Sequence, residues 1–296
     1  MTDLSGMTVA ISISDAPDRA RLGFPQREID RAVLSVCTAL VRAGANVAYG
    51  GNLDSDGYTF KIFRHLAGAY AGSRETPFLH FIPEPVARVT RYEDLLAALR
   101  EGRGTVRTEI ARGDELIPAR PGGNGVRLGN EVVQDDVALA AWLDESPTSD
   151  TAAAHTAARR MATTRTQARV VLGGKMGVLA NSRDAYQGAM PGVAEEAIMS
   201  LEAGQPLIAL GAFGGTARDI AIALDLLPPA AKVPRGPQHA GYADAITRVE
   251  ALRDQVPPAF RERLSDVADD DRAEQTAYHV AGIVAEWSAA RTLATP

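Results

Sequence analysis

Short apolar runs rich in β-branched residues alternate along this chain with segments that have the periodicity of amphipathic helices. Residues 7–14 are predicted to form a buried strand, and residues 28–43 form a helix that a glycine follows. Residues 46–49 and 77–83 are predicted as strands on either side of a helix at 58–71. Strands and helices in this order predict an α/β fold with a parallel sheet and right-handed crossovers.

The same alternation resumes in the second half of the chain. An alanine-rich helix is expected at 149–167, with Ser149 or Asp150 as its cap. A further helix starts at Thr216, where Thr216 and Asp219 have the spacing of a capping box. The other predicted elements are strands at 169–172 and 206–210 and helices at 191–203, 242–255, 258–267 and 272–293.

The middle of the chain has a weaker pattern. Residues 91–100 and 132–143 are predicted as helices, and the Gly-, Pro- and Arg-rich residues 113–129 as a long surface loop. We expect a ligand-binding domain over residues 1–230 and a helical extension over 231–296. An apolar stripe that ends at Trp287 indicates that the extension packs on the domain or on a partner subunit.

Composition excludes several classes of protein. The net charge of −6 over 296 residues argues against a general nucleic-acid or membrane-surface binder. The single cysteine, Cys37, lies in a helical pattern and is interpreted as a core residue, so neither an internal disulfide nor a metal site is predicted. No signal sequence and no membrane-spanning run is evident, and we expect a cytoplasmic protein.

The loops that follow the predicted strands are where an open parallel sheet binds its ligand. Four of them are distinctive, at residues 12–15, 50–57, 173–191 and 211–216, and three contain paired glycines directly after a strand. Glycine lets backbone amides approach a phosphate closely, although a pair can also serve only to make a turn. The predicted ligand-binding residues are Ser14, Gly50, Gly51, Gly173, Gly174, Lys175, Pro191, Gly192, Glu195, Gly211, Phe213, Gly214 and Gly215.

Two of these segments form one candidate anion site. Gly173 and Gly174 end a β-branched run, and Pro191 and Gly192 begin a helix some twenty positions later. The unpaired amides and partial positive charge of a helix start attract an anion. Lys175 is placed to neutralise a phosphate, or is an ordinary solvated loop lysine.

The common nucleotide signatures are missing. No loop has the Gly-x-Gly-x-x-Gly spacing after a strand, and no acidic residue ends the second strand to hold a ribose hydroxyl. Lys175 follows its glycines without the spacing of a P-loop. A redox or NTPase role is therefore not favoured.

Five motifs in order nevertheless resemble a known family. They are Ala48-Tyr-Gly-Gly, Gly57-Tyr-Thr, Ala168-Arg-Val-Val-Leu-Gly-Gly-Lys, Met190-Pro-Gly-Val-Ala-Glu-Glu-Ala and Gly211-Ala-Phe-Gly-Gly. Together they resemble the SLOG superfamily, named for Smf/DprA and LOG proteins, over residues 7–227. The chain looks most similar to SLOG domains found beside TIR or sirtuin-like modules in bacterial antiviral systems.

This resemblance implies a Rossmann-like, doubly wound fold that binds nucleotide-derived molecules such as ADP-ribose and its cyclic relatives. It also implies homo-oligomers that relay binding to an effector, and it requires no cofactor. No effector of recognisable type is joined to this chain. Whether the chain senses, hydrolyses or sequesters its ligand, or is a scaffold with a vestigial pocket, stays open.

The LOG branch of the superfamily implies an alternative, a phosphoribohydrolase that releases a base from a nucleoside monophosphate. Arg159 or Arg160 and Glu195 or Glu196 correspond to its catalytic pair, and we assign Arg160 and Glu195 as catalytic in that case. Glu195 is preferred because it lies off the apolar stripe of its helix.

The compact motif of that branch is interrupted here. Residues 175–190, which include a segment at 181–187 expected to be flexible, separate the glycine pair from Pro191, so binding is favoured over hydrolysis. Residues 121–125 imitate the start of the motif but lack its threonine, and we interpret them as a surface loop. Arg19 and Arg21, after the first strand, are placed to clamp a distal phosphate.

Overall fold

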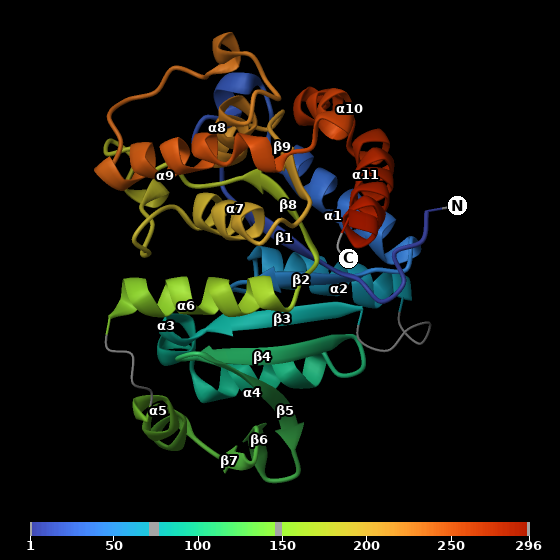
Figure 1. Ribbon diagram of the computed structural model, residues 1–296. Coiled ribbons are helices and arrows are strands. Elements are labelled where there is room, and N and C mark those ends of the chain that lie inside the picture. Colours follow the sequence, from blue (N-terminus) through green and yellow to red (C-terminus); the bar gives the residue numbers. More distant parts are fainter. Residues whose placement is uncertain (1, 71–76, 146–149, 295–296) are drawn as a thin grey trace. The chain divides into compact units, whose positions relative to one another are not determined.

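The computed structural model describes residues 2–70, 77–145 and 150–294 (Figure 1). The chain divides into two compact units, the first made of residues 1–45 and 166–296 and the second of residues 46–165. Each is an α/β unit with helices packed on its strands.

The first unit is built on three parallel strands in the order β1-β8-β9. β8 is buried along its whole length, which explains its continuous run of β-branched and aliphatic residues. The strands and helices of this unit are β1 (Thr8–Ser14), α1 (Gln26–Arg42), β8 (Ala168–Gly173), α7 (Gly192–Glu202), β9 (Leu207–Leu210), α8 (Gly215–Ala223), α9 (Ala240–Ala251), α10 (Pro258–Asp269) and α11 (Ala273–Ala294).

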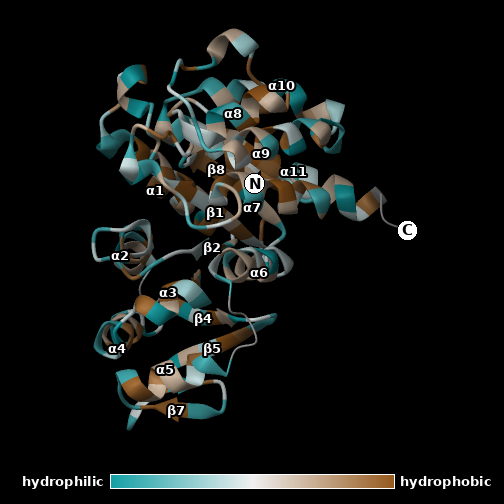
Figure 2. Cartoon of the chain, turned by 90° about the vertical axis from the view of Figure 1, so that its left-hand side faces the viewer, coloured by the Kyte–Doolittle hydropathy of each residue, from teal (hydrophilic) through white to brown (hydrophobic). Residues whose placement is uncertain are grey.

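Helices enclose these strands. α7 packs against β1 and β8, whereas α1 packs on β8 and carries α11 on its outer side (Figure 1). Figure 2 shows hydrophobic β1 and β8 in the interior of the unit. Trp287 of α11 is 2% exposed and stacks on Phe260 of α10 with ring centroids 5.5 Å apart, so the predicted stripe packs within the fold. Cys37 is a core residue as predicted, and burial raises the pKa of its thiol to about 12.

The second unit combines parallel and antiparallel strands. β2, β3 and β4 are parallel, and β4 continues through β5, β6 and β7 as an antiparallel meander. The elements are β2 (Asn46–Gly50), α2 (Tyr58–Tyr70), β3 (Phe78–Pro83), α3 (Glu84–Val89), α4 (Tyr92–Glu101), β4 (Val106–Arg112), β5 (Glu115–Gly122), β6 (Gly125–Leu128), β7 (Glu131–Val133), α5 (Asp136–Asp144) and α6 (Thr151–Thr164).

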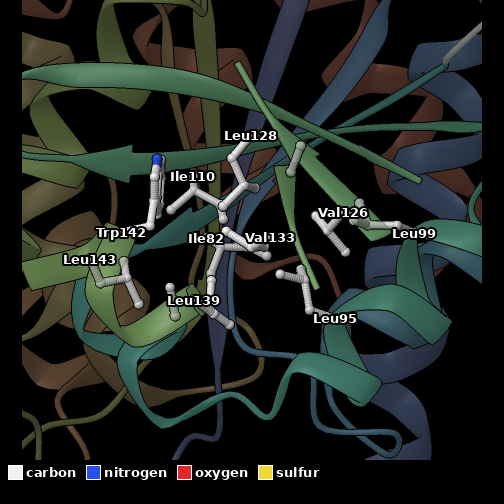
Figure 3. Close-up of a cluster of buried hydrophobic side chains, with 12 residues drawn as sticks. Ile82, Leu95, Leu99, Ile110, Val126, Leu128, Val133, Leu139, Trp142 and Leu143 are labelled. Carbon is white, nitrogen blue, oxygen red and sulfur yellow. The ribbon is translucent and has the colours of Figure 1, made fainter. Parts of the chain in front are cut away.

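A hydrophobic core joins the meander to its helices. Leu95 and Leu99 of α4 pack with Ile110 of β4 and Val126 of β6 in the cluster of Figure 3. The opposite sheet face carries a smaller cluster that contains Leu79 and Phe81, against which Ala162 of α6 packs. The helices therefore cover both faces of the sheet.

In the middle of the chain, the helix predicted at 91–100 is confirmed as α4, but the rest of the prediction was wrong. Residues 113–129 are not a surface loop, because they form the β5–β6 hairpin, and residues 121–125 lie at its turn. The helix predicted at 132–143 begins only at Asp136, since Val132 and Val133 belong to β7. Local composition favoured a loop, but the inward side chains of these strands are buried by α4 and α5.

The structure confirms the Rossmann-like α/β class and the additional C-terminal helices. Asp150 caps α6 by accepting from the amides of Ala152 and Ala153. Ser149, the other proposed cap, lies outside the described residues, and so does Ala71, the last residue of the helix predicted at 58–71. The boundary at residue 230 stays a prediction. Among the described helices, none is long and apolar enough to cross a membrane.

Candidate functional site

The loops after β1 and β8 meet at the carboxyl ends of these neighbouring strands. Ser14 pairs in register with Gly173, and its carbonyl accepts from the amide of Gly174 at 2.9 Å. Its hydroxyl accepts from the amide of Lys175 at 3.1 Å. The structure thus brings together four of the predicted ligand-binding residues.

Gly174 lies between the starts of two helices. Its φ is +107°, and a Cβ at this position would come within 2.8 Å of the Thr216 Cβ on α8 and 3.1 Å of the Val193 Cβ on α7. The two halves of the motif that residues 175–190 separate in sequence are therefore adjacent in space. Glycine is required at position 174 because Thr216 and Val193 lie too close to leave room for a side chain.

The first turn of α7 is the more open of the two helix starts. Pro191 is its N-cap and supplies no side-chain hydrogen bond to the helix amides. Gly192 is partly exposed, and Lys175 is also partly exposed, with its Nζ donating to the carbonyl of Ala185 at 2.8 Å. Free amide donors and the helix dipole give this end a preference for an anion.

The start of α8 is already occupied by the chain's own acceptors. The amide of Gly215 donates to Asp18 Oδ1 at 2.7 Å, and the amide of Thr216 donates to the carbonyl of Gly174 at 3.2 Å. The predicted capping box was wrong, because α8 starts one residue earlier with Gly214 as N-cap. Asp219 instead binds Arg235 and Tyr242, each at 2.7 Å.

A buried polar cluster surrounds this helix start. Asp18, Asp219, Arg235 and Tyr242 belong to it, and the Arg235 side chain is only 8% exposed. Asp18 Oδ2 and Arg235 Nε have no hydrogen-bond partner among the described residues, and both side chains line a hollow of about 110 Å³. Burial, and then the charge of Asp219, raise the pKa of the Tyr242 hydroxyl well above its ordinary value.

The environment of Asp18 predicts a pH effect on stability. Burial raises the pKa of its carboxyl above the ordinary 3.8, against the lowering effects of the Gly215 amide and of Arg235. An acid whose folded pKa is raised adds stability below its unfolded pKa and loses that contribution as the pH rises through the folded pKa. The stability of the wild type should therefore fall relative to Asp18→Asn as the pH rises from about 4 towards 7.

Urea unfolding of the two proteins at stepped pH measures this difference. The asparagine variant retains a side-chain oxygen for the Gly215 amide and differs mainly in having no charge to bury. Parallel stability curves over the whole range would show that Asp18 carries no such shift.

A second buried network connects β1, β8 and α7. Arg169, which is 2% exposed, donates to Ser12 Oγ at 2.7 Å, to Ser200 Oγ at 2.7 Å and to Glu196 Oε2 at 3.0 Å. Ser12 also donates to the Glu196 carboxylate. This network fixes α7 on the strands, and it engages Glu196, one of the two acids considered for catalysis.

The insertion at residues 175–190 is held in place by hydrogen bonds. The buried Asp184 carboxylate accepts from the amides of Met176 and Val178, at 3.0 and 2.7 Å. Val178 also forms a β-bridge with Gln238, in the proline-bearing segment before α9. The segment expected to be flexible therefore contains a short 3-10 turn anchored by a buried acid.

Several predicted residues have clear packing roles. Phe213 is 1% exposed and meets Phe24 edge to face at 5.2 Å. A Cβ at Gly211 would come within 3.0 Å of Leu227, and one at Gly214 within 2.5 Å of Asp18 Oδ1. Glu195 was expected to lie off the buried stripe, but it is 5% exposed, in the first turn of α7.

The remaining predicted residues lie in the second unit. Gly50 is the last residue of β2 and Gly51 follows it, and a Cβ at Gly51 would overlap the Tyr49 ring at 2.3 Å. The Gly51 carbonyl lies 3.2 Å from Nε2 of His80, and burial lowers the pKa of that imidazole to about 4. Arg160, the other residue assigned to catalysis, is exposed on α6 of the same unit.

Arg19 and Arg21, the other basic candidates, both bind backbone oxygens. Arg19 donates to the carbonyl of Phe24 at 2.7 Å, and Arg21 donates to the carbonyl of Pro234. Arg21 also lines the hollow beside Asp18.

Sequence reasoning named Glu196 and Asp219 in other roles, but it did not find the two buried networks to which they belong. For Arg169 and Ser12 a signal was present, since a charged or polar residue inside an apolar strand must find a partner when buried. Asp18 and Arg235 offered no such signal, because both lie in polar segments between elements. Within the part of the chain that the structure describes, no three His, Cys, Asp or Glu residues are grouped to hold a metal ion.

Parallel strands with helices on both faces, and loops that meet where the strands end, define a Rossmann-like α/β protein. In folds of this class ligands bind at the carboxyl ends of the strands. The family comparison makes this more specific. The family model described as SLOG cluster2 matches residues 3–256, and the chain belongs to this family. Membership indicates a nucleotide-related function. Neither a curated protein nor a solved structure showed a significant match to the chain.

Proposed function

We propose that this protein binds a nucleotide-derived small molecule of the ADP-ribose type at the carboxyl ends of β1 and β8. The observation that carries the proposal is the start of α7. It has no side-chain cap and lies against Gly174, whose neighbour Lys175 binds Ser14 through its backbone. A phosphate at this point would receive helix amides and have a lysine within the same loop.

The start of α8 is a less suitable phosphate site than the start of α7. Its Gly215 amide is already bound by the Asp18 carboxylate, so an incoming phosphate would meet a negative charge there. The phosphate therefore belongs at α7. Hydroxyl groups of the ligand, which can both donate and accept, suit the hollow beside Asp18 and Arg235.

A thermal-shift titration tests this proposal. ADP-ribose and its cyclic relatives should raise the Tm, because a ligand that binds only the folded state stabilises it by about 2.7 kcal/mol at a hundred times its Kd. Lys175→Ala should lose most of this shift. Lys232→Ala, which removes an exposed lysine of the same unit, is the matched control and should retain it.

Nucleoside monophosphates are added to the ligand panel, and chromatography of the same samples distinguishes binding from hydrolysis. Release of a free base from nucleoside monophosphates, abolished in Glu195→Gln, would establish the phosphoribohydrolase instead. No Tm shift across the panel and no product would leave the scaffold interpretation. A signalling or antiviral role, a cytoplasmic location and ligand-dependent homo-oligomers are further parts of the proposal, and sedimentation with and without ligand measures the last.

A further inference from the structure

A large cleft in the second unit carries four arginines that the proposed function does not use. It lies between the turn after α4 and the β5–β6 hairpin and has a volume of about 860 Å³. This size is typical of sites for small molecules, which occupy roughly 300–1,000 Å³. Arg100, Arg103, Arg107 and Arg120 line it.

Most of the positive charge of this cleft is not balanced by the protein, because of its four arginines only Arg107 forms an ion pair among the described residues. Among the described residues, no carboxylate forms an ion pair with Arg100, Arg103 or Arg120. The two acids nearest in sequence are engaged elsewhere, Glu101 by Arg64 at 3.3 Å and Glu109 by Arg165 at 2.8 Å.

Arg107 completes the cleft and reaches Glu109 only at 3.5 Å. Four arginines that line one cleft attract an anion, and a bound anion would offset the positive charge that they bring together. A chain with a net charge of −6 thus concentrates positive charge at one place.

Buried packing holds the walls of the cleft together, and the backbone of its two turns is accessible. Leu99 of α4 and Val126 of β6 are buried in the same cluster, which holds the helix against the hairpin (Figure 3). A Cβ at Gly104 or at Gly123 would meet no heavy atom within 4 Å. A ligand can therefore reach the backbone of both turns.

We propose that this cleft binds a small molecule with at least two phosphate groups. Guanidinium groups bind phosphate oxygens in pairs of parallel hydrogen bonds, and arginines from α4, β4 and β5 surround the ligand on several sides. A nucleic acid fits less well, because it needs a basic track longer than one cleft in an acidic chain. The site is separate in sequence from the loops of the first unit.

Calorimetric titration of the full chain with sodium tripolyphosphate at about 50 mM NaCl tests this site. Arg103→Ala/Arg120→Ala should weaken binding at least about tenfold, since two charge-assisted contacts are lost. Arg127→Ala is the matched control. Arg127 lies directly opposite Arg120 in the β5–β6 register and is exposed, but it does not line the cleft, so its loss should change affinity less than about twofold.

A further variant distinguishes binding at the cleft from binding at the proposed site of the first unit. Lys175→Ala should leave tripolyphosphate binding at the cleft unchanged. The proposal fails if the wild type does not bind, if Arg127→Ala loses as much as the double variant, or if only Lys175→Ala loses binding. Tighter binding of a short oligothymidylate, weakened equally by Arg127→Ala, would identify a polyanion surface instead. Circular dichroism confirms that each variant is folded.

Discussion

Gly215→Ala is expected to destabilise the first unit by about 2–5 kcal/mol. Gly215 has a φ of +69°, and a Cβ there would lie 2.5 Å from the carbonyl carbon of Gly173 and 2.6 Å from its oxygen. Both atoms belong to the backbone at the end of β8, so no side-chain rotation can relieve the overlap. The loop before α8 must move, and the Asp18–Gly215 bond is lost with it.

Gly6→Ala is the control that separates the cost of an unfavourable backbone conformation from the cost of steric overlap. Gly6 has a φ of +81° in the same unit, but a Cβ there would meet nothing within 4 Å, so the expected cost is only about 1–2 kcal/mol. Urea unfolding is followed by the fluorescence of Trp287 in a Trp142→Phe background, so that the signal comes only from the first unit, since the chain has 2 tryptophans. Equal losses in the two variants would show that the backbone of Gly173 is not a barrier.

The elements with continuous burial were predictable from the sequence. β1 and β8 are short runs of aliphatic residues, and α1 has its apolar residues at helical spacing, so local pattern and tertiary environment agree. The predicted ends of these elements differ from the observed ends by at most two residues. Helices α9, α10 and α11 were found for the same reason.

The meander was not predictable in this way. β5 contains three exposed residues, Glu115, Pro118 and Arg120, and β6 is only 4 residues long. Neither has an apolar run of its own. Their stability comes from residues far along the chain, since Leu139 and Trp142 of α5 bury the inner face of these strands.

The meeting of the loops after β1 and β8 was predictable from the sequence, but the hydrogen bonds of these loops were not. Glycine pairs mark the loops at the carboxyl ends of β2, β8 and β9, whereas the loop after β1 contains none. The partner of Gly215 is Asp18, 197 positions away, and only the folded chain shows that this acid occupies the start of α8. The two helix starts therefore differ: the Asp18 carboxylate binds the start of α8, whereas the N-cap Pro191 provides no side-chain hydrogen bond at the start of α7.

The buried Arg169 provides the second large effect. Glu196→Ala should cost about 2–4 kcal/mol, because it leaves the guanidinium in a site that is 2% exposed without its carboxylate. The loss is below that of a fully buried pair because the Glu196 side chain retains 18% exposure. Arg169 keeps its hydrogen bonds to Ser12 and Ser200, but these hydroxyl groups are neutral and do not offset the charge of the guanidinium. Urea unfolding read from Trp287 measures the change.

Arg169→Met/Glu196→Met distinguishes a stranded charge from lost packing. Methionine has a similar length and removes both charges together, and replacement of a buried ion pair by apolar residues is often neutral or stabilising. The double variant should thus be more stable than Glu196→Ala, although Ser12 and Ser200 lose their partner. If the double variant is no more stable than Glu196→Ala, the cost lies in the packing of α7 on the strands and not in the charge of Arg169.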